Sequence, residues 1–139
     1  MTLSLESGLL TLQQVKPDSI IMTYCSDYAD PNSQSIDLAE AAALTRIFGN
    51  AVPVSSLKAQ LGHTMGASGV LELAVTLEMA RRNTLLPTAN LTAPDEACVG
   101  LDLLRQPRRT AMRFFVKDCF AFGGINAVLV GELPSAAES

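Results

Sequence analysis

Apolar runs separated by polar turns divide the chain into alternating helices and strands. Leucines at helical spacing predict a short helix over residues 5–14. Residues 19–25 are apolar almost throughout, which is typical of a buried parallel strand. An alanine-rich helix is expected over residues 37–48 and a second strand over residues 51–55. The first part of the chain therefore predicts helix, strand, helix and strand.

The rest of the chain continues this alternation. Residues 68–83 form the most hydrophobic predicted helix, and its apolar positions lie on nearly every side, which indicates a helix buried between layers. Two adjacent strands are expected over residues 112–122 and 126–130. This order of elements predicts an α/β layered sheet. We expect one domain over residues 1–132 and a flexible tail over residues 133–139.

The composition is apolar for a chain of this size. Hydrophobic residues make up 48% of the 139 residues, and tryptophan is absent. The mean hydropathy is +0.26, yet no run reaches the roughly 18 apolar residues of a bilayer-spanning helix. We therefore expect another polypeptide, and no membrane, to cover part of the apolar surface. The N-terminal apolar stretch follows no basic residue, so no signal peptide is expected and the cytoplasm is the expected location.

Cysteine and histidine are too few for the common metal sites. The three cysteines are an odd number without a CxxC spacing, which argues against a disulfide framework or a zinc site. His63 is the single histidine, which argues against a histidine-based metal centre. We expect no metal and no cofactor. The net charge of −4 makes a nucleic-acid partner improbable.

The basic residues are concentrated in the second half of the chain, where seven of the ten lie at or after Arg81. They could form an ordinary solvated face, or a docking patch for an acidic partner. The sequence leaves both interpretations open. The candidate patch consists of Arg105, Arg108, Arg109 and Arg113.

Residues 55–69 form a polar, glycine-punctuated stretch between a predicted strand and the most hydrophobic helix. Lys58 and His63 are costly to bury there unless they are satisfied or used. The glycines allow the backbone to approach a ligand closely. His63 lies just ahead of the helix, whose N-terminal amides favour negative charge. The stretch is either a reaction site or the location of a single satisfied histidine.

A second glycine-rich segment follows the first of the two C-terminal strands, at residues 120–126 (FAFGGIN). Two glycines and an asparagine are typical of a tight turn with exposed amides. Such a turn is a plain hairpin or an oxyanion loop, and this segment alone does not decide between them.

Together these segments resemble three ordered blocks of the β-ketoacyl-acyl-carrier-protein synthases, condensing enzymes with the thiolase fold. The blocks are residues 55–69, 87–91 (PTANL) and 119–127 (CFAFGGINA), and residues 37–40 (DLAE) match an acidic pair that opens a helix in that family. The resemblance runs from about Leu5 to Val130 and covers only the second half of the family's fold. It implies a thiolase-like α/β half-fold with a mixed sheet and a buried helix.

The resemblance also implies roles for individual residues. His63 would donate a hydrogen bond to the malonyl thioester carbonyl and stabilise the enolate formed on decarboxylation, and Lys58 would set the electrostatics around it. Glu72 matches a buried glutamate that supports this cluster. Phe122 matches a gating phenylalanine whose backbone N–H completes an oxyanion hole. The supporting positions of that loop are Phe120, Gly123 and Gly124, with Ala121 in place of the first glycine.

Two parts of the family's site are absent from this sequence. The nucleophilic cysteine of the family opens a buried helix in the N-terminal half, whereas Cys25 and Cys119 lie on predicted strands and are expected to be core residues. A second histidine of the family falls eight positions before Asp37, where this chain has Ala29. Loss of one such donor typically costs about 10²–10³ in rate. The chain is therefore not expected to be a competent enzyme alone.

Three functions remain open. The chain could complement a separate N-terminal half and catalyse decarboxylative Claisen condensation of acyl and malonyl thioesters on an acyl carrier protein, in fatty acid or polyketide biosynthesis. It could instead resemble a chain-length factor, a non-catalytic partner of an active ketosynthase. It could also be a relic or fragment without a function of its own. The resemblance does not indicate the acyl chain length or the pathway.

Overall fold

A mixed five-stranded sheet forms the centre of the computed structural model, which describes residues 20–24, 34–121 and 125–133. The strand order is β4-β2-β1-β6-β7. β1 pairs in parallel with β2 and β6, β2 pairs in parallel with β4, and β6 pairs antiparallel with β7. The strands are β1 (Ile20–Tyr24), β2 (Pro53–Ser56), β4 (Asp102–Leu103), β6 (Phe114–Ala121) and β7 (Ile125–Glu132).

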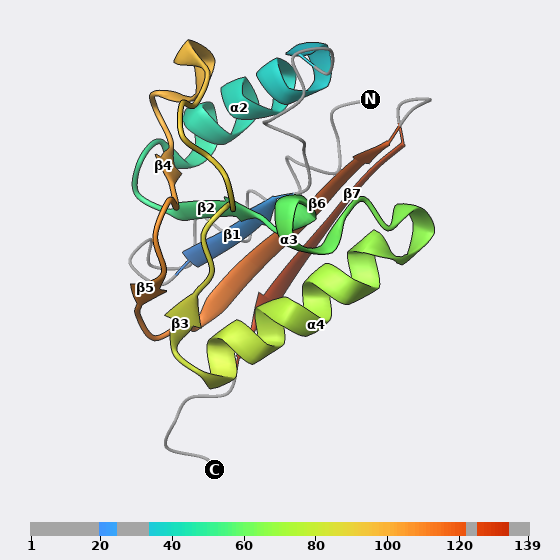
Figure 1. Cartoon of the computed structure of the whole chain (residues 1–139), viewed down its shortest axis with the longest axis vertical. Helices are drawn as coiled ribbons and strands as arrows, with labels where there is room; N and C mark the ends of the chain where they lie inside the picture. Colours follow the sequence, from blue (N-terminus) through green and yellow to red (C-terminus); the bar gives the residue numbers. More distant parts are fainter. Residues whose placement is uncertain (1–19, 25–33, 122–124, 134–139) are drawn as a thin grey trace.

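One long helix covers each face of the sheet (Figure 1). α2 (Gln34–Phe48) lies on one face and α4 (Ser68–Arg81) on the other. The predicted order of these helices and strands is confirmed, although α2 begins three residues earlier than expected and α4 ends two residues sooner. The helix predicted over residues 5–14 lies outside the described residues. The shorter elements are α3 (Lys58–Leu61), η2 (Met65–Ala67), η3 (Glu96–Cys98), and the antiparallel pair of β3 (Thr84–Leu85) and β5 (Arg108–Arg109).

Alternation along β6 divides the core into two parts. Phe114 and Val116 pack with the buried side chains of α2, whereas Phe115 packs with Met79 of α4. Successive side chains of a strand point to opposite faces. The even-numbered residues of β6 therefore face α2 and the odd-numbered residues face α4. The next residues of β6 follow the same rule, and this places the ionisable pair Lys117 and Asp118 on opposite faces of the sheet.

The helix α4 buries several polar side chains and exposes several apolar ones. Its buried residues are Ser68, Glu72, Thr76 and Met79, while Val70, Leu71 and Leu77 are exposed by 72%, 42% and 45%. The prediction of a helix covered on both sides is therefore wrong for this chain by itself, because only one side of α4 meets the sheet. Within the part of the chain that the structure describes, no helix combines the length and apolarity needed to cross a membrane.

Candidate functional site

The polar stretch predicted from the sequence forms the connection between β2 and α4. After the buried Leu57, the single turn of α3 ends at Gly62, whose φ of 76° lies in the left-handed region and turns the chain toward His63. The Oγ atoms of Thr64 and Ser68 are 3.1 Å apart, which joins the connection to the first residue of α4. The connection therefore has a defined shape at the N-terminal end of α4.

Two of the three sequence blocks meet at this connection. The buried Thr88 accepts a hydrogen bond at its Oγ1 from the backbone N–H of Ser56, over 2.9 Å. The side-chain amide of Gln60 donates to the backbone carbonyl of Pro87. Residues 55–69 and residues 87–91 are thus parts of one local structure.

The imidazole of His63 is oriented by the backbone that follows it. Its Nδ1 accepts a hydrogen bond from the backbone N–H of Met65 over 3.1 Å, and Met65 has a left-handed φ of 53°, which is rare for a residue with a side chain. In a neutral imidazole one nitrogen accepts and the other donates. Because Nδ1 is the acceptor, the proton is on Nε2, which makes Nε2 a hydrogen-bond donor.

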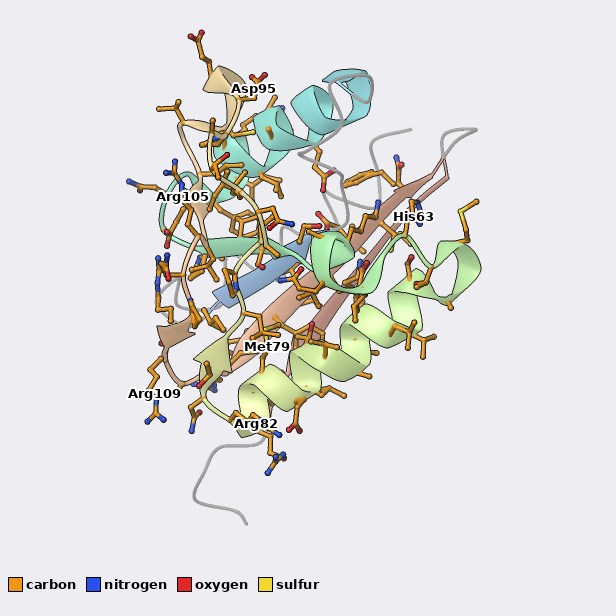
Figure 2. All side chains as sticks on the ribbon, in the orientation of Figure 1. His63, Met79, Arg82, Asp95, Arg105 and Arg109 are labelled. Atoms are coloured by element: carbon orange, nitrogen blue, oxygen red, sulfur yellow. The ribbon has the colours of Figure 1, made fainter. Side chains whose placement is uncertain are left out.

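His63 and Lys58 are less buried than the sequence led us to expect. His63 is exposed and Lys58 is half-buried, so the expected cost of burying both groups does not arise in this chain by itself. Figure 2 shows His63 on the connection that leads into α4. Burial raises the pKa of Glu40 to about 11, and the positive charge of Lys58, at the start of α3, only opposes this rise. In this chain by itself a ligand or another polypeptide has access to His63.

Glu72 lies under α4 and forms a buried ion pair with Lys117 of β6. The Oε2 atom of Glu72 is 2.7 Å from the Nζ atom of Lys117, and the two side chains are 5% and 4% exposed. The ammonium group of Lys117 also donates to the backbone carbonyl of Asp118 and to the Sγ atom of Cys119, the latter over 3.1 Å. Sequence reasoning assigned Glu72 to the cluster around Lys58 and His63 and missed Lys117 as its partner.

Two buried carboxyl groups meet on the opposite face of the sheet. Burial, followed by the charge of Asp118 and a hydrogen bond with it, raises the pKa of Glu40 to about 11. Burial also raises the pKa of Asp118 to about 6, against the opposing charge of Lys117. At neutral pH Glu40 therefore keeps its proton, and its protonated carboxyl group donates a hydrogen bond to the carboxylate of Asp118. The sequence signal for this pair was a Lys-Asp dipeptide within the apolar run FFVKDCFAF.

The second glycine-rich segment joins the two antiparallel strands of a hairpin. β6 ends at Ala121, which pairs with Ile125 at the start of β7. Phe120 is half-buried and packs against the core on the α2 side. The predicted gate and its glycines, Phe122, Gly123 and Gly124, lie outside the described residues, as does Ala29. The two strands that flank the segment are paired antiparallel, and the choice between a plain turn and an oxyanion loop stays open.

Two of the four arginines of the predicted patch form ion pairs. Arg108 binds Asp102 with both terminal nitrogens, one of them at 2.8 Å, and Arg113 binds Glu132 at 3.1 Å. Arg105 is exposed, and neither it nor Arg109 forms an ion pair with another described residue. Arg105 and Arg109 are therefore the two arginines of the patch whose charges are not paired with a described acidic residue. Figure 2 shows both at the same edge of the molecule.

Two of the three cysteines lie in the described part of the chain. Cys98 is buried and Cys119 is half-buried, and Cys25 lies outside the described residues. Among the residues that the structure describes, no group of three or more histidine, cysteine, aspartate or glutamate side chains could hold a metal ion.

Comparison with known proteins identifies the family. Residues 9–92 match the family described as beta-ketoacyl synthase, C-terminal domain. The 3-oxoacyl-[acyl-carrier-protein] synthase 1 of Escherichia coli K12 is 33% identical over 108 residues, which are 75% of this chain and 27% of that protein. The granaticin polyketide β-ketoacyl synthase 1 of Streptomyces violaceoruber is 33% identical over 138 residues, which are 95% of this chain and 32% of that protein.

A solved structure confirms the fold. The crystal structure of a β-ketoacyl synthase from Burkholderia phymatum STM815 superimposes with a TM-score of 0.77 and 34% identity, over 94% of this chain and 33% of that one. The chain thus spans a third or less of the length of each of these three relatives. The predicted thiolase-like α/β half-fold and the resemblance stated from the sequence are both confirmed. The chain belongs to the β-ketoacyl synthase family, of which it contains the C-terminal domain.

Proposed function

We propose that this chain is the C-terminal part of a β-ketoacyl synthase that condenses acyl and malonyl thioesters of an acyl carrier protein. The nucleophilic cysteine would come from a complementary N-terminal half. The observation that carries the proposal is the orientation of His63, whose Nδ1 accepts the N–H of Met65 and whose Nε2 is therefore a donor. A donor of this kind is what the decarboxylation step requires.

The chemistry assigns each group a separate task. During decarboxylation the bond between the malonyl methylene carbon and its carboxylate breaks, carbon dioxide leaves, and the electron pair moves toward the thioester carbonyl. His63 Nε2–H donates to that carbonyl oxygen as its negative charge grows, and the ammonium of Lys58 stabilises the same charge. The carbanion then attacks the acyl thioester held on the cysteine of the N-terminal half, and the thiolate leaves.

The outward face of α4 supports the need for a second polypeptide. Val70, Leu71 and Leu77 expose apolar surface side by side on this helix, although the same helix buries Glu72 beneath it. Leu129 of β7 is also exposed, by 46%, and its cross-strand partner Lys117 contacts α4, so the apolar surface continues beside the helix. An apolar surface of this kind marks an interface. We propose that the N-terminal half packs on it.

Introducing a charge on this face tests the proposed packing. We expect Val70→Glu to weaken binding of a co-expressed N-terminal half by about 10- to 100-fold, because an unpaired carboxylate would be buried in the interface. The affinity is measured by co-purification and by titration of the two purified polypeptides.

Val99→Glu is the matched control, since Val99 is 78% exposed, similar to the 72% of Val70, but follows η3 on the α2 side of the sheet. It should leave the affinity within about twofold of the unmodified chain, as surface substitutions usually do. Equal binding by both variants and the unmodified chain would show that α4 is not the interface.

The carrier protein is the second proposed partner, and its acidic surface would dock on the free arginines. Reversal of both charges, Arg105→Glu with Arg109→Glu, is expected to lower the affinity of the complete enzyme for the carrier by about 10-fold at low salt, and by less at high salt. Arg46→Glu reverses an exposed charge on α2 and serves as the control. If the double variant binds the carrier as tightly as the unmodified enzyme, the arginines are an ordinary solvated face and do not form a docking patch.

A non-catalytic role similar to that of a chain-length factor is the alternative. The observation in its favour is Ala29, which stands where the family has its second histidine. A subunit that only shapes the partner's acyl tunnel would not need His63, so substitution of this histidine separates the two proposals.

A further inference from the structure

Two adjacent ionisable residues of β6 each meet a buried carboxyl group from the helix that covers their face of the sheet. Lys117 meets Glu72 of α4, and Asp118 meets Glu40 of α2. All four side chains are buried. Only one of the two contacts joins opposite charges, and it is the contact on the α4 side, beneath the helix that begins at the His63 connection.

The ion pair of Lys117 and Glu72 restricts where α4 can lie. Side chains that are 4% and 5% exposed cannot exchange their partner for water, so separation of the two charges would leave both desolvated and unpaired. Breaking a buried pair by removal of one partner typically costs far more than breaking a surface pair. The 2.7 Å contact is therefore a tight constraint between the second turn of α4 and β6.

The ion pair lies one helical turn away from the residue that joins α4 to the His63 connection. Glu72 is four residues after Ser68, the first residue of α4, whose hydroxyl contacts Thr64 next to His63. Lys117 lies within β6, the strand that α4 contacts. A shift of α4 along β6 would displace the His63 connection, which leads directly into the helix.

We propose that Lys117 is a positioning residue, whose ion pair with Glu72 fixes α4, and with it the His63 connection, on strand β6. In this arrangement the carboxylate of Glu72 pairs with the ammonium group of Lys117 beneath the helix. The catalytic part of this inference rests on the proposed condensation activity, whereas the pairing itself does not.

The pairing is tested on the stability of the full chain by a double-mutant cycle with Lys117→Met and Glu72→Gln. We expect Lys117→Met to lower the folding equilibrium constant on the order of 10²- to 10³-fold, because it leaves a buried carboxylate unpaired. The double variant should return to within about 10-fold of the unmodified chain. Urea denaturation measures all four proteins. Additive effects in the double variant would overturn the pairing and the proposal with it.

Glu78→Gln is the matched control on the same helix. Glu78 is 44% exposed and binds Arg81 and Arg82 at the surface, so its loss should change the folding equilibrium constant less than about fivefold. A loss as large as that of Lys117→Met would mean that any charge removed from α4 unfolds the chain, and the cycle would not support a specific pair.

The positioning role is tested in the complex with the N-terminal half, by the rate at which malonyl carrier protein is decarboxylated. The stable double variant should lower kcat by about 10- to 100-fold and leave KM within about twofold, since misplacement affects the transition state more than binding. Full kcat in the double variant would reduce the pair to a structural role and overturn the proposal. Absence of activity in the unmodified complex would instead overturn the proposed function and leave the double-mutant cycle to decide the pairing.

Discussion

His63→Ala is expected to lower the decarboxylation rate of the complex by about 10²- to 10³-fold, which is the usual loss when one donor to a developing oxyanion is removed. The stability of the chain should change little, because the imidazole is exposed and its one hydrogen bond is with the nearby backbone of Met65. Single-turnover release of carbon dioxide from malonyl carrier protein measures the rate, and urea denaturation checks the fold.

Two amide substitutions test whether the hydrogen-bond donor at the position of Nε2, and not the imidazole ring as such, is needed for activity. Glutamine at position 63 can bring its amide nitrogen near the place of Nε2, whereas the shorter asparagine reaches only the place of Nδ1, which accepts from Met65 in this structure. We expect His63→Gln to retain more activity than His63→Asn. Equal activity of the alanine variant and the unmodified complex would exclude the catalytic role and favour the chain-length-factor alternative, for which Ala29 is the sequence argument.

The elements around this site follow from local sequence patterns, but their environment does not. The glycine-punctuated stretch after the strand at residues 53–56 is a candidate site of chemistry in the sequence because it places Lys58 and His63 between two apolar segments. In this chain by itself His63 is exposed and Lys58 is half-buried, since a sequence window does not show what covers it. The same reason explains α4, whose outer apolar side chains are exposed in the described part of the chain.

The buried ionic contacts were missed for a different reason. Alternation along β6 places Lys117 and Asp118 on opposite faces of the sheet, but their partners are distant in sequence. Glu72 and Glu40 lie on two separate helices, and only the parallel pairing of β1 with both β2 and β6 brings those helices to the same strand. Long-range contacts of this type require the topology, which one sequence read locally does not provide.

Asp118→Asn is expected to stabilise the chain at pH 8, by up to about 3 kcal/mol. The pKa of Asp118 is raised from 3.8 to about 6, and each pH unit corresponds to about 1.4 kcal/mol. Between these values the folded state holds a proton that the unfolded state has released, so stability falls as pH rises through this window. The asparagine cannot ionise, and it also removes the charge that helps to raise the pKa of Glu40.

The pH dependence distinguishes this explanation from a general packing effect. The unmodified chain should lose stability from about pH 4 upward, and Glu40 should extend the loss beyond pH 6 because its pKa is about 11. The gain from Asp118→Asn should therefore be small at pH 4 and reach its full size above pH 6. Urea denaturation at a series of pH values measures it, with the exposed Asp95→Asn as the control.

A gain of equal size at every pH would mean that the amide packs better than the carboxyl group and that the charge has no part in it. Destabilisation at pH 8 would mean that the Asp118 carboxylate is satisfied by the positive charge of Lys117, which opposes the rise that burial causes in the pKa of Asp118. In that case the two faces of β6 would form one balanced electrostatic unit. The stability gain predicted here requires instead that the carboxyl pair on the α2 side remains a cost to the fold, which Lys117 reduces only in part.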